Sequence, residues 1–266
     1  MSSEVRRITV PQFAALKGSG RKITVLTAYD YATARLLDST GIEGILVGDS
    51  LSMAVQGHEN TLPVTLEQMI YHGEIVCRAV RHALVIVDMP FPSFQLGTYR
   101  AIENAARILK QTGCQAVKIE GGVAQAEVIG ALVSAGIPVM AHCGLRPQQV
   151  QQLGGYRVQR DEEQLLADAM AAQQAGAFSI VLECIPEAVA SRITAELNIP
   201  TIGIGAGPGC DGQVLVVNDL LGITEGHVPR HVKAYADLKN VIREAVARFR
   251  DEVRSGDFPG EEQTFK

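Results

Sequence analysis

Short aliphatic runs recur along the chain, and most of them end abruptly at a charged, polar or glycine residue. A continuous apolar run of this length is typical of a strand in a parallel sheet, because such a strand is buried on both faces. The runs predict strands at residues 23–28, 45–48, 84–87, 116–120, 137–141, 179–182, 199–204 and 214–217.

Amphipathic segments with helical spacing separate these runs. One begins at Thr65, because Thr65 and Gln68 have the spacing of a capping box. Another ends at Gly113, a residue suited to a helix C-cap. After a short leading helix within residues 11–22, the expected helices cover 31–38, 65–81, 99–111, a stretch ending near 134, 161–174, 187–197 and 235–254.

The alternation of strands with helices predicts right-handed βαβ units and a parallel sheet. Eight such units in a chain of 266 residues fit an α/β fold of the closed (β/α)8 type, a TIM barrel. No linker-like or low-complexity stretch interrupts the pattern, so we expect a single domain over residues 1–266, with a leading helix and a polar C-terminal tail. A doubly wound open sheet is the alternative fold.

Polar side chains at the predicted strand ends are the main indication of function. In a barrel, the carboxyl ends of the strands meet at one rim, where the catalytic residues lie. One acid after an apolar run is more often a loop or N-cap residue than a ligand, so only their repetition predicts a site. These residues are Tyr29, Asp49, Ser50, Asp88, Lys118, Glu120, His142, Glu183 and Asn218.

Three of these residues suit a metal ion. Asp49, Asp88 and Glu120 follow successive strands and offer hard oxygen ligands. Mg²⁺ binds a few carboxylates and keeps its other positions for water or substrate, such as the two oxygens of a 2-oxo acid. No grouping of His and Cys in the sequence competes for a softer metal. The alternative is that the three acids are solvated loop residues.

Acid–base and substrate-binding groups are indicated as well. Lys118 and Glu120 are two positions apart, so they face the same side of their strand. A cation there suits a substrate carboxylate or an enolate oxygen. The alternative is that Lys118 and Glu120 only form an ion pair with each other. Glu183, in an apolar setting, is a candidate general base or an N-cap-like acid. His142 either binds substrate and shuttles a proton or is a hydrogen-bonded packing residue.

Composition and charge narrow the class of protein. Hydrophobic residues make up 47% and charged residues 20% of the chain, an ordinary globular balance. The net charge of -5 gives no electrostatic reason to expect nucleic acid or an anionic membrane as a partner. No apolar run approaches the ~20 residues of a membrane span, and no secretory signal is expected. With five scattered cysteines, we expect a cytoplasmic protein without disulfides or a structural zinc site.

Short motifs at the strand ends, and in the loops after them, form a recognisable series. They are Thr27-Ala28-Tyr29-Asp30, Leu46-Val47-Gly48-Asp49-Ser50, Gln56-Gly57-His58, 61–65, 117–122, Gly154-Gly155-Tyr156, Leu182-Glu183-Cys184, 202–207, Asp211-Gly212-Gln213 and 258–262. In this order they resemble the ketopantoate hydroxymethyltransferase family, also called 3-methyl-2-oxobutanoate hydroxymethyltransferase. The likeness covers almost the whole chain, and the motifs are specific in combination.

The resemblance implies a barrel of the phosphoenolpyruvate/pyruvate type and an enzyme of pantothenate biosynthesis, which leads to coenzyme A. The implied reaction transfers a hydroxymethyl group from 5,10-methylenetetrahydrofolate to 3-methyl-2-oxobutanoate and gives 2-dehydropantoate through an enolate stabilised by Mg²⁺. The implied Mg²⁺ ligands are Asp49, Asp88 and Glu120. The implied substrate-binding residues are Asp49, Ser50, Asp88 and Lys118, and the implied proton acceptor is Glu183. Members of the family are usually homodecamers.

Three positions depart from the usual family pattern. Arg146 and Gln149 stand where Thr and Ser are usual, and Gln263 stands where His is usual. None of them is an implied metal ligand or base. Two alternatives to the implied function are a C–C lyase acting on another oxo acid, and a non-catalytic barrel that serves in assembly or metabolite binding.

Overall fold

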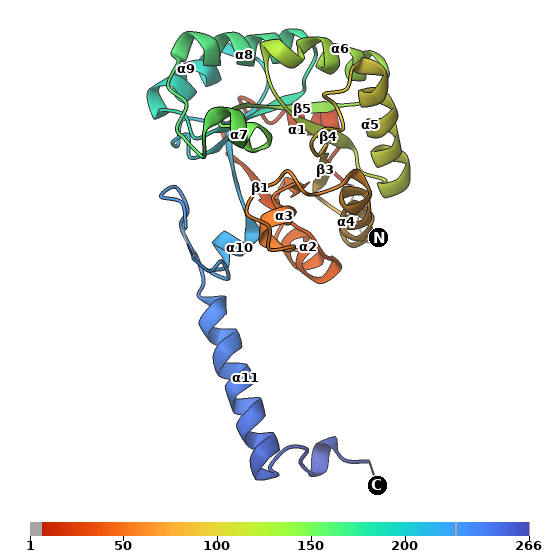
Figure 1. Ribbon diagram of the computed structural model, residues 1–266, viewed down its shortest axis with the longest axis vertical. Helices are drawn as coiled ribbons and strands as arrows, with labels where there is room; N and C mark the ends of the chain where they lie inside the picture. Colours follow the sequence, from red (N-terminus) through yellow and green to blue (C-terminus); the bar gives the residue numbers. More distant parts are fainter. Residues whose placement is uncertain (1–6, 227, 266) are drawn as a thin grey trace. The chain divides into compact units, whose positions relative to one another are not determined.

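The aliphatic runs form one closed sheet of parallel strands in the computed structural model, which describes residues 7–226 and 228–265 (Figure 1). The strands follow one another around the barrel in chain order, so each pairs with its sequence neighbours and β1 closes onto β8. The predicted barrel is therefore confirmed, and the open sheet is excluded. Its strands are β1 (Ile23–Thr27), β2 (Gly44–Val47), β3 (Leu84–Asp88), β4 (Ala116–Glu120), β5 (Val139–Gly144), β6 (Ser179–Glu183), β7 (Thr201–Ile204) and β8 (Gly212–Leu215).

Helices connect the strands and begin and end where the sequence signals lie. The capping box is formed, because Thr65 Oγ1 accepts from the Gln68 N–H while Thr65 N–H donates to Gln68 Oε1. Gly113 ends its helix in the left-handed region, with φ 75°. The α-helices are α1 (Val10–Ala14), α2 (Tyr31–Asp38), α3 (Leu51–Ala54), α4 (Leu66–Ala79), α5 (Thr98–Thr112), α6 (Ala126–Ser134), α7 (Val150–Leu153), α8 (Glu162–Gln174), α9 (Glu187–Glu196), α10 (Val217–Leu220) and α11 (Leu238–Ser255). The 3₁₀ turns are η1 (Val123–Gln125), η2 (Pro147–Gln149) and η3 (Glu261–Gln263).

The barrel interior is an apolar core that continues into a polar mouth. Successive side chains of a strand alternate between its two faces. Two positions beyond Ile86, in the buried cluster, comes Asp88, and two positions beyond Ala116 comes Lys118. The same period that packs the core therefore aims the polar side chains at the mouth. The core cluster comprises Phe13, Ile23, Val25, Leu46, Leu84, Ile86, Ala116, Met140, Phe178, Val181, Ile202 and Val214.

The short helix α1 packs against the amino-terminal end of the barrel. Phe13 is fully buried and meets Phe178 edge to face, with ring centroids 5.9 Å apart. Gly44, which opens β2, makes room for this ring, because an added Cβ atom would lie 3.3 Å from it and 3.1 Å from Val25. Aromatic pairs of this geometry contribute about 0.5–1.5 kcal/mol beyond their buried area.

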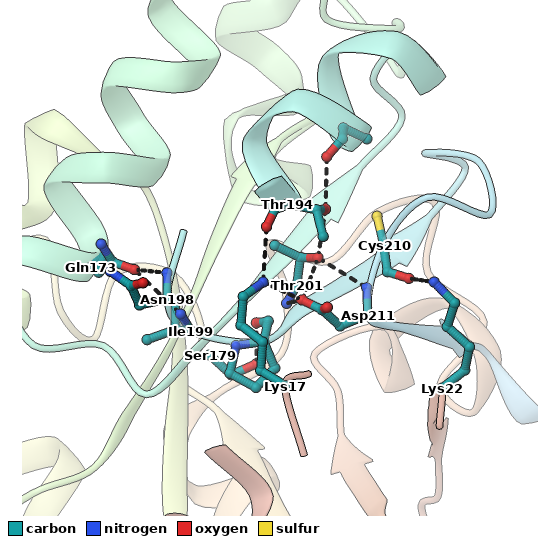
Figure 2. A network of polar contacts seen from close by, with 12 residues as sticks. Lys17, Lys22, Gln173, Ser179, Thr194, Asn198, Ile199, Thr201, Cys210 and Asp211 are labelled. Atoms are coloured by element: carbon teal, nitrogen blue, oxygen red, sulfur yellow. Dashed lines mark hydrogen bonds and ion pairs between the residues drawn. The ribbon is translucent and has the colours of Figure 1, made fainter. Parts of the chain in front are cut away.

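A polar network at the same end ties together segments far apart in the sequence (Figure 2). Lys17 Nζ donates to Asp211 Oδ2 at 2.8 Å and to the Thr194 carbonyl at 2.9 Å. Thr201 gives the same carboxylate its backbone N–H at 2.9 Å and its hydroxyl at 3.1 Å. Lys17 and Asp211 together thereby join the chain before β1 to α9, β7 and the start of β8.

The sequence placed the eighth strand two residues too late. The prediction of residues 214–217 is wrong, since β8 is Gly212–Leu215 and Val217 opens α10, so Asn218 lies in that helix and not at a strand end. The polar Gln213 weakened the aliphatic signal at the true start. Gly212 is required there, because an added Cβ atom would lie 2.4 Å from the Ile23 carbonyl oxygen.

The glycine-rich turn after β7 is packed against the chain's own side chains. Gln213 Nε2 donates to the Gly207 carbonyl at 2.9 Å. Gly207 has φ +79°, and an added Cβ atom would lie 2.6 Å from Cγ of Glu187. The glycine is therefore needed for close packing of the turn on α9.

The described chain divides into two compact units, the barrel up to Val216 and a second unit from Val217 onward. Within the second unit, Leu238 N–H donates to the Leu221 carbonyl at the start of α11. Near the end of α11, Phe249 meets the ring of Phe258 at 5.3 Å. The expectation of one domain over residues 1–266 stays a prediction.

We expect Asp211→Asn to lower the free energy of unfolding by on the order of 2 kcal/mol, because the substitution leaves the Lys17 ammonium without its carboxylate. A thermal melt followed by circular dichroism measures the change, and Asp251→Asn on exposed α11 is the matched control. Equal melting temperatures for Asp211→Asn and the control would contradict the assigned role of the network.

Candidate active site

The end of β2 brings Asp49 and Ser50 to the mouth of the barrel. Asp49 is buried, and its backbone N–H donates to Oδ2 of Asp88 at 3.1 Å. Gly48 leaves room for the Ser50 hydroxyl, because an added Cβ atom would lie 2.7 Å from Ser50 Oγ. The hydroxyl of Tyr29, from the end of β1, lies 2.8 Å from the same Oγ. Burial raises the pKa of Tyr29 to about 12, so this phenol stays protonated at neutral pH.

A buried ion pair joins the ends of β3 and β4. Asp88 and Lys118 are register partners, and Lys118 Nζ lies 2.8 Å from Asp88 Oδ1 with both side chains at most 6% exposed. Burial alone would lower the pKa of Lys118, but the nearby carboxylates, Asp88 first and then Asp49 and Glu120, raise it above its ordinary value. The ammonium therefore stays charged inside the protein.

His142 lies between two acids from neighbouring strands. It pairs in register with Glu120, and its Nδ1 is 3.9 Å from Glu120 Oε1. Its Nε2 is 3.1 Å from Oε2 of Glu183, at the end of β6. Neither ring nitrogen makes a well-angled hydrogen bond within the described residues. Burial and the charge of Lys118 lower the pKa of His142, so the imidazole is neutral at neutral pH.

Gln148, in η2 after β5, belongs to the site although the sequence did not single it out. Its side-chain amide donates to Asp49 Oδ2 at 2.9 Å, and its backbone N–H donates to Glu120 Oε2 at 3.0 Å. It is one of several glutamines in this loop, and nothing in the sequence distinguishes it from Gln149. Its burial, at 6% exposed, is the signal that only the structure supplies.

Like charges crowd this mouth. Burial and the neighbouring Asp88 raise the pKa of Asp49 from 3.8 to about 7. Burial, then the charge of Asp49, raise the pKa of Glu120 well above its ordinary value. Lys118 offsets only part of this repulsion, because it is a single ammonium among the carboxylates of Asp49, Asp88, Glu120 and Glu183.

The motif Gly154-Gly155-Tyr156 brings an aromatic residue to the edge of the site. Burial and then the charges of Asp49, Glu183 and Glu120 raise the pKa of Tyr156, so its ring lies within electrostatic reach of the mouth. Its hydroxyl lies 3.6 Å from Sδ of Met53 on α3, while the residue itself is 49% exposed. Tyr156 therefore lines the outer edge of the site.

A surface depression at the other end of the barrel is lined by Asp38, Arg81 and His82. Its one buried acid is already satisfied, because the carboxylate of Asp38 accepts the backbone N–H groups of Arg81, His82 and Ala83. The depression therefore reflects a structural tie before β3 and offers no chemistry comparable with that of the mouth.

Eight sequence-predicted positions thus come together at one mouth, and their roles stay predictions. These are Tyr29, Asp49, Ser50, Asp88, Lys118, Glu120, His142 and Glu183. The departures Arg146 and Gln149 lie in the loop after β5, where Arg146 has a buried Nε without a hydrogen-bond partner among the described residues. Gln263 lies in η3 of the second unit.

The family model for ketopantoate hydroxymethyltransferase matches residues 7–261 of this chain. The chain belongs to this family. A 3-methyl-2-oxobutanoate hydroxymethyltransferase of Rhodopirellula baltica is 52% identical over 98% of the chain and 97% of the relative. One of Pelobacter propionicus is 53% identical over the full length of both.

Solved structures resemble the barrel at low sequence identity. Phosphoenolpyruvate phosphomutase from Streptomyces platensis subsp. rosaceus is 16% identical over 93% of this chain and 88% of its own, with a TM-score of 0.62. 2,3-Dimethylmalate lyase, of the PEP mutase/isocitrate lyase superfamily, is 18% identical over 97% and 89%, with a TM-score of 0.58. These likenesses show the fold, a closed barrel of parallel strands with helices between them.

The donor set of this hydroxymethyltransferase chain fits a hard divalent cation. Within residues 7–226 and 228–265, no three His, Cys, Asp or Glu side chains are already gathered in metal-ligand geometry. Asp49, Asp88 and Glu120 are nevertheless all buried at one mouth, and the first and last have raised pKa values. A divalent cation would relieve this repulsion, and Mg²⁺ favours such oxygen ligands.

We expect Asp49→Asn to stabilise the protein at pH 8 in the presence of a chelator. Since its pKa rises from 3.8 to about 7 on folding, ionised Asp49 destabilises the folded state increasingly between these values and fully above them. The gain is on the order of 2–4 kcal/mol at pH 8 and absent near pH 4. Melting temperatures at both pH values measure it, with Asp251→Asn as control, and a lower melting temperature of Asp49→Asn at pH 8 would refute the expectation.

Proposed function

We propose that the chain transfers a hydroxymethyl group from 5,10-methylenetetrahydrofolate to 3-methyl-2-oxobutanoate, giving 2-dehydropantoate in pantothenate biosynthesis. Family membership over almost the whole length supports the reaction class. The observation that carries the proposal is the linked set of side chains at the mouth. Asp49, Asp88 and Lys118 are joined through hydrogen bonds and an ion pair, beside the acids Glu120 and Glu183.

Asp49, Asp88 and Glu120 would hold Mg²⁺, which when bound supplies Lewis-acid polarisation of the substrate ketone. Lys118 keeps a full positive charge beside these acids, so it stabilises negative charge that develops on a substrate oxygen. The hydroxyl of Ser50, held by Tyr29 at 2.8 Å, is the neutral group offered to the substrate carboxylate.

Glu183 is the proposed base that removes the proton from C3 of 3-methyl-2-oxobutanoate. Its side chain is 17% exposed, so it is the acid of the set that solvent and substrate reach most easily. The neutral ring of His142 approaches its Oε2 to 3.1 Å and restricts its orientation. The carbon left by proton removal then attacks the one-carbon unit delivered by the folate, and water supplies the hydroxyl oxygen of the product. Both C–N bonds that hold this carbon to the folate break, and the two nitrogens take up the C3 proton and one proton of the water, so tetrahydrofolate leaves.

We predict that Glu183→Gln lowers the rate of C3 proton exchange by about 10²–10⁴-fold, because the amide cannot accept the proton. Loss of the substrate C3–H signal in D₂O, followed by NMR, measures the exchange. Glu103→Gln on α5, an exposed acid paired with Arg100, is the control and keeps the parent rate. Exchange at the parent rate in Glu183→Gln would remove Glu183 as the base.

The reaction itself is tested by forming product from 3-methyl-2-oxobutanoate with and without 5,10-methylenetetrahydrofolate and Mg²⁺. We expect 2-dehydropantoate only when both are present, because the folate supplies the carbon and the carboxylate set needs a cation. Cleavage of an oxo acid without folate would favour a C–C lyase. A lack of any cation-dependent proton exchange would favour a non-catalytic barrel.

The partners, cellular location and assembly of the protein are proposed as the sequence predicts them. We propose small-molecule substrates, a cytoplasmic location and a homo-oligomer, with the homodecamer of the resembling family as the expected assembly. Among residues 7–226 and 228–265, no helix is long and apolar enough to cross a bilayer.

A further inference from the structure

Gln148 uses both ends of its side-chain amide and its backbone N–H within the mouth of the barrel. Its Nε2 donates to Asp49 Oδ2 and to the carbonyl of Met89, both at 2.9 Å. Its Oε1 accepts from Nε2 of Gln95 at 2.9 Å, and its backbone N–H donates to Glu120 Oε2 at 3.0 Å. A buried glutamine whose side-chain amide is bonded at both its nitrogen and its oxygen is held in one orientation, because each alternative would leave buried polar groups unpaired.

Through these contacts, one residue of the loop after β5 links the ends of three other strands. Asp49 follows β2, Met89 follows β3 and Glu120 ends β4, while Gln148 itself lies in η2 after β5. The separation along the chain between Gln148 and Asp49 is 99 residues. Gln148 therefore contacts groups at the ends of β2, β3 and β4 at the same time.

Gln148 holds two of the three proposed metal ligands, Asp49 and Glu120, each through one carboxylate oxygen. Gln148 occupies Oδ2 of Asp49 and Oε2 of Glu120, which leaves the other oxygen of each carboxylate for a cation or substrate. Partners that hydrogen-bond to metal ligands fix their orientation, and their loss typically weakens metal affinity about 10–100-fold. The backbone contact to Glu120 survives any non-proline substitution, so among the proposed metal ligands a side-chain variant removes only the contact to Asp49.

We propose that Gln148 is a positioning residue that orients Asp49 and Glu120 for binding a divalent cation. This inference rests on the proposed function, in which those acids hold Mg²⁺. Glutamine is the required residue type, because glutamate lacks the two N–H donors and asparagine is shorter by one methylene group.

The neighbouring Gln149 provides a matched control. It lies in the same turn and is only half-buried, and its side chain makes no hydrogen bond with other described residues. Gln148→Met and Gln149→Met thus make the same chemical change one position apart. Methionine keeps approximately the length of glutamine and removes its polar groups.

The test is a calorimetric titration of the full-length chain with Mg²⁺ in the absence of substrate. We expect Gln148→Met to bind Mg²⁺ about 10–100-fold more weakly than the parent, and Gln149→Met to remain within about twofold. In activity assays, the Mg²⁺ concentration for half-maximal rate should rise by the same factor in Gln148→Met. The kcat at saturating Mg²⁺ should change far less, which a general loss of folding would not produce.

Parent-like Mg²⁺ affinity in a folded Gln148→Met would overturn the inference and leave the proposed function standing. If that variant does not fold, Gln95→Leu decides, because it removes the donor to Gln148 Oε1 from an exposed position. A several-fold loss of affinity in Gln95→Leu supports the inference, and no loss overturns it. A parent chain that binds no Mg²⁺ would instead overturn the proposed metal role and the inference together.

Discussion

The ion pair between Lys118 and Asp88 is the interaction on which the mouth of the barrel depends. It is buried, at 2.8 Å, and Lys118 is the ammonium that faces the acids Asp49 and Glu120 as well. Buried like charges repel strongly because no water screens them. Without the ammonium, the ends of β2, β3 and β4 would carry acids with no buried counter-charge. The same charge is available to a substrate oxygen, so the stability and the chemistry of the mouth share one group.

The strand period explains why so much of this mouth was predictable from the sequence. Asp88, Lys118 and Glu120 end aliphatic runs, and in parallel strands of one closed sheet all such ends meet at one rim. Spacing by two then aims Lys118 and Glu120 to the same side as the core residue Ala116. Fold and strand-end residues follow from local pattern, because the alternation that buries the core also sets the direction of the polar side chains.

The parts that the sequence did not predict depend on contacts distant along the chain. Gln148 acquires its place through Asp49, 99 residues away, and no local pattern separates it from Gln149. The start of β8 was missed for a related reason. Gly212 has a low strand preference, and Gln213 interrupts the aliphatic run. They are strand residues because Ile23 of β1 pairs with Gly212 and Gly203 of β7 pairs with Gln213. Tertiary pairing therefore overrides local propensity at these positions.

The two ends of the barrel contribute to folding stability with opposite signs. At the mouth, crowding raises the pKa of Asp49 to about 7, so the acids there oppose folding while they are ionised. At the other end, Phe13 packs on Phe178, and Asp211 holds Lys17 and Thr201. The interior between the two ends is aliphatic and carries no charge, and its packing keeps the strand ends in register. A rigid, well-packed base thus allows the mouth to retain a strained set of charges, which is the condition that cation binding would relieve.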